Sequence, residues 1–201
     1  LIFDGTSLNI IFNTLFDILN GEIVDFVDDG FLRQLSFEES ILDSDYIENA
    51  SAFFDEMFVD LDETYDLLES VKIDNNDGYE YFESFNLEES LLNSFLNNHS
   101  ITRNQFFCSV FAYTLSRFTG SSKVSFNLIE DGRGHLDLSE SVGMFVRTLP
   151  ILVDCRNQAV DSFLRYCGGL VNRVMFYDLY PFRLLANDYD LNSNILFQYS
   201  H

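Results

Sequence analysis

Apolar residues recur at helical spacing in two stretches near the start of the chain. The first stretch predicts an amphipathic helix over residues 7–19, and the second predicts a helix over residues 46–59. The acidic residues 22–44 between them show no clear period, so we expect a loop there. Residues 60–78 are rich in Asp and end in the turn-forming run Asn75-Asn76-Asp77-Gly78, which indicates a linker or subdomain boundary.

Strand-like and helix-like patterns alternate in the remainder of the chain, which indicates an α/β layer architecture. The helix predicted to end at Phe118 is apolar nearly all round, so we expect it to be buried. Pro150 lies inside a predicted strand and therefore indicates an edge strand or a bulge. The predicted strands cover residues 79–85, 124–128, 145–153 and 195–199, and the predicted helices cover residues 86–96, 103–118 and 160–174.

Charge narrows the range of partners for this chain. Its 33 acidic and 11 basic residues give a formal net charge of −22, which argues against a nucleic-acid or anionic-membrane partner. We expect no transmembrane span, because no apolar run reaches the length that one requires. Cys108, Cys155 and Cys167 are widely spaced and form no CxxC pair, so we expect reduced thiols in a cytoplasmic protein and neither zinc nor disulfides.

Four motifs occur along the chain in a fixed order. Asp4-Gly5 follows the apolar run Leu1-Ile2-Phe3, and Val142-Gly143-Met144-Phe145-Val146-Arg147-Thr148-Leu149-Pro150 follows a strand and a Gly-Arg turn. Tyr180-Pro181-Phe182 comes next, and Asp190-Leu191-Asn192-Ser193-Asn194-Ile195-Leu196-Phe197-Gln198 comes last. Together these motifs resemble those of the condensation domains of non-ribosomal peptide synthetases, which belong to the chloramphenicol acetyltransferase-like superfamily. Arg147 departs from the family pattern, which usually has Asn at this position.

The resemblance implies an α/β fold in which a mixed sheet is flanked by helices. It assigns most of the chain to the C-terminal half of a V-shaped, two-lobed domain. Residues 1–70 would be the tail of the N-terminal subdomain, and residues 71–201 would be a C-terminal subdomain that is incomplete at its end. The family motif His-His-x-x-x-Asp-Gly would place the catalytic histidines before Leu1, so we expect a fragment that is inactive alone.

The implied activity is peptide-bond formation between an upstream acyl or peptidyl thioester and the amine of a downstream aminoacyl thioester. Upstream and downstream peptidyl carrier proteins would hold both groups on 4'-phosphopantetheine arms, beside neighbouring synthetase domains, and this chain would bind no cofactor directly. Within the superfamily, the alternatives are an epimerisation domain, a heterocyclisation domain and a free-standing acyltransferase. A domain that only docks carrier proteins, without catalysis, is the alternative from another class.

The resemblance also assigns candidate site residues. Asp4 would hold the motif loop through an ion pair with an arginine that we expect upstream, and Gly5 would let the backbone approach the reacting carbonyl. Arg147 has a permanent charge, and we expect it to hydrogen-bond an Asp or Glu of this acidic chain. Core packing is the alternative role for Gly143, Phe145 and Thr148. The residues assigned to the substrate channel are Gly143, Phe145, Arg147, Thr148, Tyr180, Pro181, Phe182, Asp190 and Asn194.

No metal site is predicted. His99, His135 and His201 are isolated in the sequence and have no metal-ligand spacing, so we interpret them as structural or surface residues.

Overall fold

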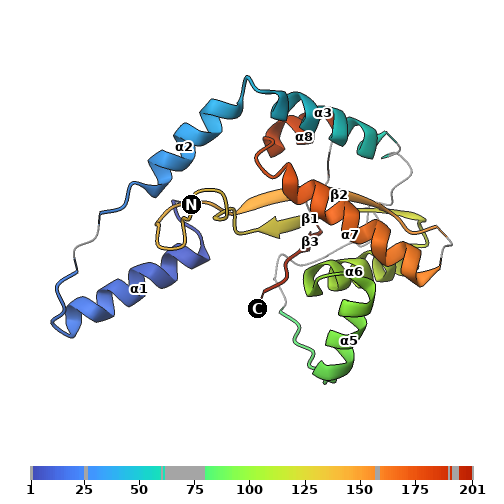
Figure 1. Ribbon diagram of the computed structural model, residues 1–201, viewed down its shortest axis with the longest axis horizontal. Coiled ribbons are helices and arrows are strands. Elements are labelled where there is room, and N and C mark those ends of the chain that lie inside the picture. Colours follow the sequence, from blue (N-terminus) through green and yellow to red (C-terminus); the bar gives the residue numbers. More distant parts are fainter. Residues whose placement is uncertain are drawn as a thin grey trace, which may run out of the picture.

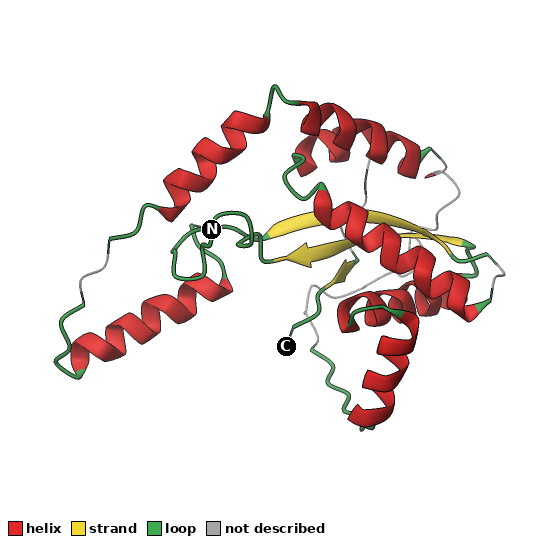
Figure 2. Cartoon of the chain, in the orientation of Figure 1, coloured by secondary structure: helices red, strands yellow, loops and turns green. Residues whose placement is uncertain are grey.

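A three-stranded mixed sheet organises the computed structural model, which describes residues 2–24, 27–59, 61, 80–156, 159–189, 191 and 195–200 (Figure 2). Strand β1 (Lys123–Glu130) lies in the centre, antiparallel to β2 (Arg147–Asp154) and parallel to β3 (Leu196–Phe197). The order β2-β1-β3 places β2 at an edge, as Pro150 predicted, because proline has no amide hydrogen to donate to a further strand. The mixed sheet and its flanking helices confirm the predicted α/β fold class.

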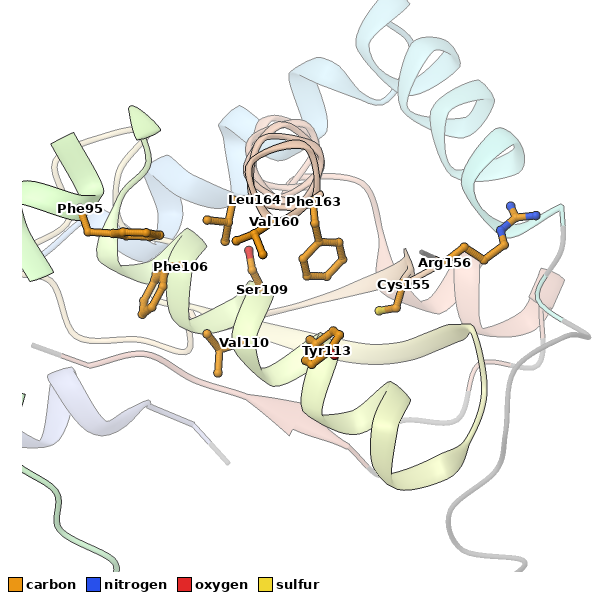
Figure 3. Close-up of a pocket in the computed structure, with 10 residues that line it drawn as sticks. All are labelled: Phe95, Phe106, Ser109, Val110, Tyr113, Cys155, Arg156, Val160, Phe163 and Leu164. Atoms are coloured by element: carbon orange, nitrogen blue, oxygen red, sulfur yellow. The ribbon is translucent and has the colours of Figure 1, made fainter. Parts of the chain in front are cut away.

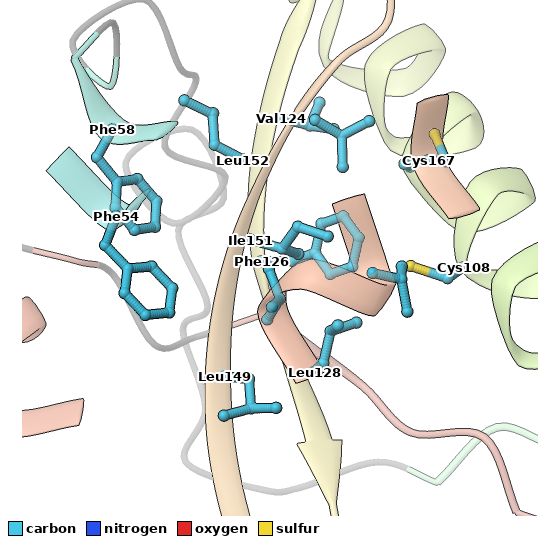
Figure 4. Close-up of a cluster of buried hydrophobic side chains, with 14 of the residues drawn as sticks. Phe54, Phe58, Cys108, Val124, Phe126, Leu128, Leu149, Ile151, Leu152 and Cys167 are labelled. Atoms are coloured by element: carbon cyan, nitrogen blue, oxygen red, sulfur yellow. The ribbon is translucent and has the colours of Figure 1, made fainter. Parts of the chain in front are cut away.

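Helices cover both faces of this sheet. On one face, α6 (Arg103–Thr119) and α7 (Val160–Phe176) pack against each other and against the strands. On the other face, α3 (Asp45–Phe58) places Phe54 and Phe58 against β2, opposite the buried thiols of Cys108 and Cys167 (Figure 4). The helices α5 (Glu89–His99) and α8 (Phe182–Tyr189) complete the layers. The hydrophobic core is therefore built around β1 and β2.

Two helices lie away from these layers. Figure 1 shows α1 (Gly5–Leu19) beginning beside the β1–β2 connection and running away from the sheet, and α2 (Gly30–Ile41) leading on to α3. The apolar stripe of α1 is exposed along its length, with Phe16 62% exposed and Leu19 71% exposed. Its N-terminus, by contrast, is held by buried contacts that are described below.

Most of the helices that the hydrophobic pattern predicted are present. Residues 7–19 lie in α1, residues 46–59 correspond to α3, and residues 160–174 lie in α7. The helix that follows Thr102 begins with a complete capping box between Thr102 and Gln105, and Gly120 ends it in the left-handed conformation that glycine adopts without strain.

Three expectations were wrong. Residues 30–41 form α2 where a loop was expected, because contacts with distant residues stabilise this helix. Residues 80–88 form no strand, and their exposed aromatic side chains have no neighbouring strand among the described residues. Helix α6 is buried on one face only, since Tyr113 is 52% exposed and Phe118 is 76% exposed.

The predicted subdomain boundary near residue 70 lies outside the described residues and stays a prediction. Within the described residues, α3 belongs to the same hydrophobic core as the sheet.

The core makes a direct stability prediction. Phe126 is 1% exposed and packs edge-on against Phe111, with the ring centroids 5.0 Å apart. We expect Phe126→Ala to lower the free energy of unfolding by about 3–5 kcal/mol, because it removes a buried ring and leaves a cavity. Urea denaturation followed by circular dichroism measures this change. Phe118→Ala on the exposed face of α6 is the matched control, with an expected effect of about 0.5 kcal/mol or less; equal losses for both variants would contradict this account of the core.

Candidate functional site

Asp4 caps the first helix from a buried position. One carboxylate oxygen, Oδ1, accepts hydrogen bonds from the backbone amide of Ser7 at 2.9 Å and from the Ser7 hydroxyl at 2.8 Å. These bonds satisfy amide groups that a helix N-terminus leaves without partners. The side chain of Asp4 is only 2% exposed, so its charge needs a partner inside the protein.

Arg133 supplies that partner. Its Nη2 lies 2.8 Å from Asp4 Oδ1 and 2.9 Å from the hydroxyl of Ser7. Its Nη1 donates to the carbonyl oxygens of Leu138 and Ser141, so the guanidinium also holds the β1–β2 connection. The expectation that the arginine lies upstream of Asp4 is therefore wrong, because Arg133 follows Asp4 by 129 residues.

The segment around Gly143 closes this cluster. The backbone amide of Phe145 donates to Asp4 Oδ2 at 3.1 Å, and the backbone amide of Gly143 donates to the hydroxyl oxygen of Ser7 at 3.0 Å. The ring of Phe145 lies 4.5 Å from the Arg133 guanidinium, in a cation–π contact. Asp4, Ser7, Arg133, Gly143 and Phe145 thus form one buried network, which we call the Asp4 network.

Glycine is required at two positions beside the Asp4 network. Gly132 has a φ of +67°, and a side chain there would place its first carbon 2.0 Å from the carbonyl oxygen of Phe145. At Gly143 the same atom would lie 2.9 Å from the Phe145 ring. Both glycines let the β1–β2 connection fold tightly over Arg133.

Hydrogen bonding keeps Asp4 ionised. Burial alone would raise the pKa of its carboxyl group, but hydrogen bonds from Ser7, Phe145 and Arg133 outweigh it and hold the pKa below its ordinary value. Asp4 therefore remains a carboxylate at neutral pH. A group of this kind positions other residues and is unsuited to accept a proton from a substrate.

Arg147 lies at the start of β2 in a second charged cluster. Its Nη2 lies 2.7 Å from Oε1 of Glu38 on α2, and its Nε lies 3.6 Å from a carboxylate oxygen of Asp178. Asp178 in turn contacts His135, with 2.8 Å between the oxygen and Nε2. The expectation that Arg147 hydrogen-bonds an acidic residue of the fold is confirmed, and the partner is Glu38.

The strand register adds a further carboxyl group beside this cluster. Glu130 lies directly opposite Arg147 in the β1–β2 pairing. Burial raises the pKa of Glu130, and the charges of Asp131 and Asp178 raise it further. Arg147 thus occupies a position where acidic groups surround its charge.

The remaining predicted site residues lie outside the Asp4 network and the Arg147 cluster. Gly5 is exposed at the start of α1 with open space around its α-carbon, and Thr148 is half-buried on β2 opposite Ile129. Tyr180 is buried in the core against Phe54, with 5.5 Å between the ring centroids. Pro181 and Phe182 are half-buried at the start of α8, and Asp190 and Asn194 lie outside the described residues.

Two hollows are relevant to ligand binding. A pocket of about 370 Å³ opens between α5, α6 and α7, with Phe95, Phe106, Tyr113 and Phe163 among its walls (Figure 3). A smaller cleft of about 200 Å³ lies between α2 and the segment that leads into β2, beside the Asp4 network.

The larger pocket contains a thiol that is a weak nucleophile. Cys155 lines this pocket, and burial raises its pKa to about 11, so the thiol stays protonated at neutral pH. Burial likewise raises the pKa of Cys108 and of Cys167 to about 12. None of these cysteines fits the role of an activated nucleophile.

The described residues contain no group of three or more His, Cys, Asp or Glu side chains that is arranged to hold a metal ion. Of the helices in the described ranges, none combines the length and the apolar character that crossing a membrane requires.

Comparison with known proteins decides the family. The family model for the condensation domain matches residues 1–200. The chain belongs to the condensation-domain family. The resemblance that the four motifs indicated is thereby confirmed.

This condensation-domain chain is also similar to two synthases of Bacillus subtilis (strain 168). It is 25% identical to a subunit of plipastatin synthase over 198 residues, which are 94% of this chain and 8% of that protein. It is 24% identical to subunit 1 of surfactin synthase over 194 residues, which are 92% of this chain and 5% of that protein. The chain thus spans less than a tenth of either synthase.

Solved structures share the fold. The first condensation domain of the calcium-dependent antibiotic synthetase matches with a TM-score of 0.71 and 17% identity, over 98% of this chain and 48% of that one. The EpoB cyclization-docking bidomain from Sorangium cellulosum gives a TM-score of 0.72 with 14% identity, over 98% and 43%. The epimerization domain from tyrocidine synthetase B gives 0.65 with 16% identity, over 99% and 51%. Because domains of different subtypes share this fold, the fold alone does not assign a subtype.

Sequence reasoning missed Arg133, Ser7 and Glu38. Arg133 is preceded by Asp131-Gly132, a turn signal, and a buried arginine beside such a turn requires an acidic partner. Ser7 lies three residues after Asp4, the spacing of a capping contact. Glu38 had no signal, since its helix was not predicted.

The Asp4 network makes a prediction about acid stability. Asp4→Asn keeps the shape of the side chain but leaves the buried charge of Arg133 without its partner. We expect the free energy of unfolding to fall by about 3 kcal/mol at neutral pH, as measured by urea denaturation.

The pH dependence provides the control for this prediction. A carboxyl group with a lowered folded-state pKa stabilises the protein above its unfolded-state pKa of about 3.9, and this contribution is lost as the pH falls through the folded-state value. The parent protein should therefore lose stability below about pH 4 more steeply than Asp4→Asn. Asp17→Asn on the exposed side of α1 should leave both measurements unchanged. A variant Asp4→Asn as stable as the parent at pH 7 would contradict the assigned role.

Arg147 allows a matched test of the second cluster. Its side chain is 15% exposed, so Arg147→Asn removes a partly buried charge and leaves Glu38 and Asp178 without it. We expect a loss of about 1–3 kcal/mol in the free energy of unfolding, measured in urea. Arg33→Asn is the control, because the Arg33–Asp29 pair is exposed and contributes about 0.5 kcal/mol or less. Equal effects of the two substitutions would show that the Arg147 cluster adds nothing beyond a surface ion pair.

Proposed function

We propose that this chain is part of a condensation domain that forms an amide bond between two groups carried as thioesters. The donor is an acyl or peptidyl group on an upstream carrier protein, and the acceptor is the amine of an aminoacyl group on a downstream carrier protein. The observation that supports this proposal is the Asp4 network, which joins the Asp-Gly end of the first family motif to the Val-Gly-x-Phe segment.

The proposed reaction is an acyl transfer. The amine nitrogen attacks the donor carbonyl carbon, a C–N bond forms and the C–S bond of the upstream thioester breaks. The nitrogen loses one proton, and the departing sulfur of the upstream pantetheine gains one. Catalysis of this step requires that two tethered groups are brought together and that the charge on the carbonyl oxygen is stabilised.

In this proposal Asp4 is a positioning residue. Its carboxylate stays ionised and holds the start of α1 to Arg133 and to the amide of Phe145. It thereby fixes the backbone that directly precedes Gly5, where the motif histidines would be attached. The family histidine that deprotonates or orients the amine has no counterpart within residues 1–201, which contain no adjacent pair of histidines.

The substrate channel in this proposal runs past Gly143, Phe145, Arg147 and Thr148. Gly143 and Phe145 are part of the Asp4 network, and Arg147 borders the adjacent cleft. Phosphopantetheine enters only as the arm of a carrier protein. Residues 1–70 would belong to the N-terminal subdomain and residues 71–201 to the C-terminal subdomain, so that the channel lies where the two meet.

Activity of the full-length protein tests this proposal. Upstream and downstream carrier proteins are loaded with an acyl group and an aminoacyl group, and intact-protein mass spectrometry follows the acyl mass from one carrier to the other. We expect transfer with the full-length protein and none with residues 1–201 alone, because the proposed base lies outside them. Full-length Asp4→Asn should transfer at about a hundredth of the parent rate or less, since misplacement by 1 Å costs about that much.

The control and the contradicting outcomes are specific. Asp17→Asn should transfer at the parent rate. Loaded carriers that bind the full-length protein without any mass transfer would contradict the proposal and indicate a docking domain. Loss of water from the product would indicate heterocyclisation, and inversion of the carrier-bound residue without transfer would indicate epimerisation.

A further inference from the structure

The cleft beside the Asp4 network is lined by both apolar and polar groups. Phe31, Gln34 and Glu38 of α2 form one wall, and Met144, Val146 and Arg147 lie across from them. Phe145 lines the cleft as well, and its backbone amide donates to Asp4. A ligand in the cleft would therefore lie next to the segment that the Asp4 network holds in place.

Gln34 has a buried acceptor without a donor. Its side-chain Nε2 donates to Glu38 Oε1 at 2.8 Å, which fixes the orientation of the amide because an oxygen facing the carboxylate would be repelled. The other amide atom, Oε1, is buried and has no hydrogen-bond partner among the described residues, and the residue as a whole is 4% exposed. A buried acceptor of this kind costs free energy until a donor reaches it.

The charges around Gln34 balance. Glu38 and Arg147 are the two charged side chains that line the cleft, and they are paired with each other. Asp178, a second carboxylate in reach of Arg147, also contacts His135. Arg147 would repel a ligand with a full positive charge, and Glu38 would repel a ligand with a negative charge. This balance favours an uncharged donor, such as a hydroxyl or a primary carboxamide.

The walls and the size of the cleft define the rest of the ligand. The rings of Phe31 and Phe145 pack edge-on with their centroids 6.2 Å apart, and Met144 adds further apolar surface. At about 200 Å³ the cleft is smaller than the pockets of about 300–1,000 Å³ that hold drug-sized ligands. It has room for one side chain and too little for an extended acyl chain.

We propose that this cleft is a specificity subsite that binds one substrate side chain carrying an uncharged hydrogen-bond donor on an apolar stem, with Gln34 Oε1 as its acceptor. This inference rests on the proposed amide-forming function, because that function supplies aminoacyl groups next to the Asp4 network. Gln34 is then a residue that determines specificity, and Arg147 keeps the subsite neutral.

Binding of two small probes to the full-length protein tests the subsite without requiring activity. The probes p-cresol and p-xylene have nearly the same shape and differ in one hydroxyl donor, and ligand-detected saturation-transfer NMR gives their dissociation constants. We expect p-cresol to bind about tenfold more tightly, because one buried hydrogen bond separates the two probes. Gln34→Leu should remove this preference while p-xylene still binds.

Two further variants serve as controls for the binding test, one that fills the cleft and one that lies outside it. Val146→Trp fills the cleft from a position that is 40% exposed, so it should weaken both probes without disturbing Gln34. Asn98→Leu makes a polar-to-apolar change at an exposed position on α5 and should leave both constants unchanged. Equal affinity of the parent protein for the two probes, or no binding of either, would overturn the subsite.

Substrate choice by the full-length protein gives the second readout. With tyrosine or phenylalanine loaded on the downstream carrier, and then on the upstream carrier, kcat/KM should favour tyrosine about tenfold in one of the two positions. Gln34→Leu should abolish that ratio, because it should lower kcat/KM for tyrosine about tenfold more than kcat/KM for phenylalanine. A probe preference without any acyl transfer would preserve the subsite and refute the proposed function, whereas acyl transfer with equal rates and equal probe affinities would refute the subsite alone.

Discussion

The buried ion pair between Asp4 and Arg133 is the contact on which the arrangement around it depends. Its cost of desolvation is high, and the protein meets it with hydrogen bonds from Ser7 and Phe145 to the carboxylate and with carbonyl acceptors for the guanidinium. The pair therefore joins three backbone segments in one geometry: the start of α1, the turn at Gly132 and the segment at Gly143.

The sequence predicted those parts of the fold that local chemistry determines. Period and capping signals specified α1, α3, α6 and α7, since each of these helices has its own apolar stripe or cap. Helix α2 was missed because its stability comes from distant contacts, such as Phe31 with Phe145 and Glu38 with Arg147. The aromatic run at Tyr81 and Phe82 was wrongly predicted to be a strand. Both side chains are more than 80% exposed in the structure, so their aromatic character did not indicate burial in a sheet.

The residues of the candidate site likewise include some that the sequence indicated and some that it did not. Asp4, Gly143 and Phe145 were recognised from motifs, and the structure brings them into contact. Arg133 and Gln34 were not recognised from the sequence. Arg133 pairs with Asp4, and Gln34 shares a cleft with residues 144–147, so each role depends on residues more than a hundred positions away. A local sequence pattern contains no information about such contacts. Tyr180 carried a motif signal and packs against Phe54 in the core, and its assignment to the substrate channel stays a prediction.

The distance along the chain between Asp4 and Arg133 has a consequence for folding. Their contact closes a loop of 129 residues, and the entropy of that closure is lost before the ion pair compensates for it. The β1–β2 pairing, by contrast, joins nearby residues and can form first. The N-terminus of α1 would then dock after the folding transition state, so substitutions in the Asp4 network would accelerate unfolding while leaving the refolding rate nearly constant.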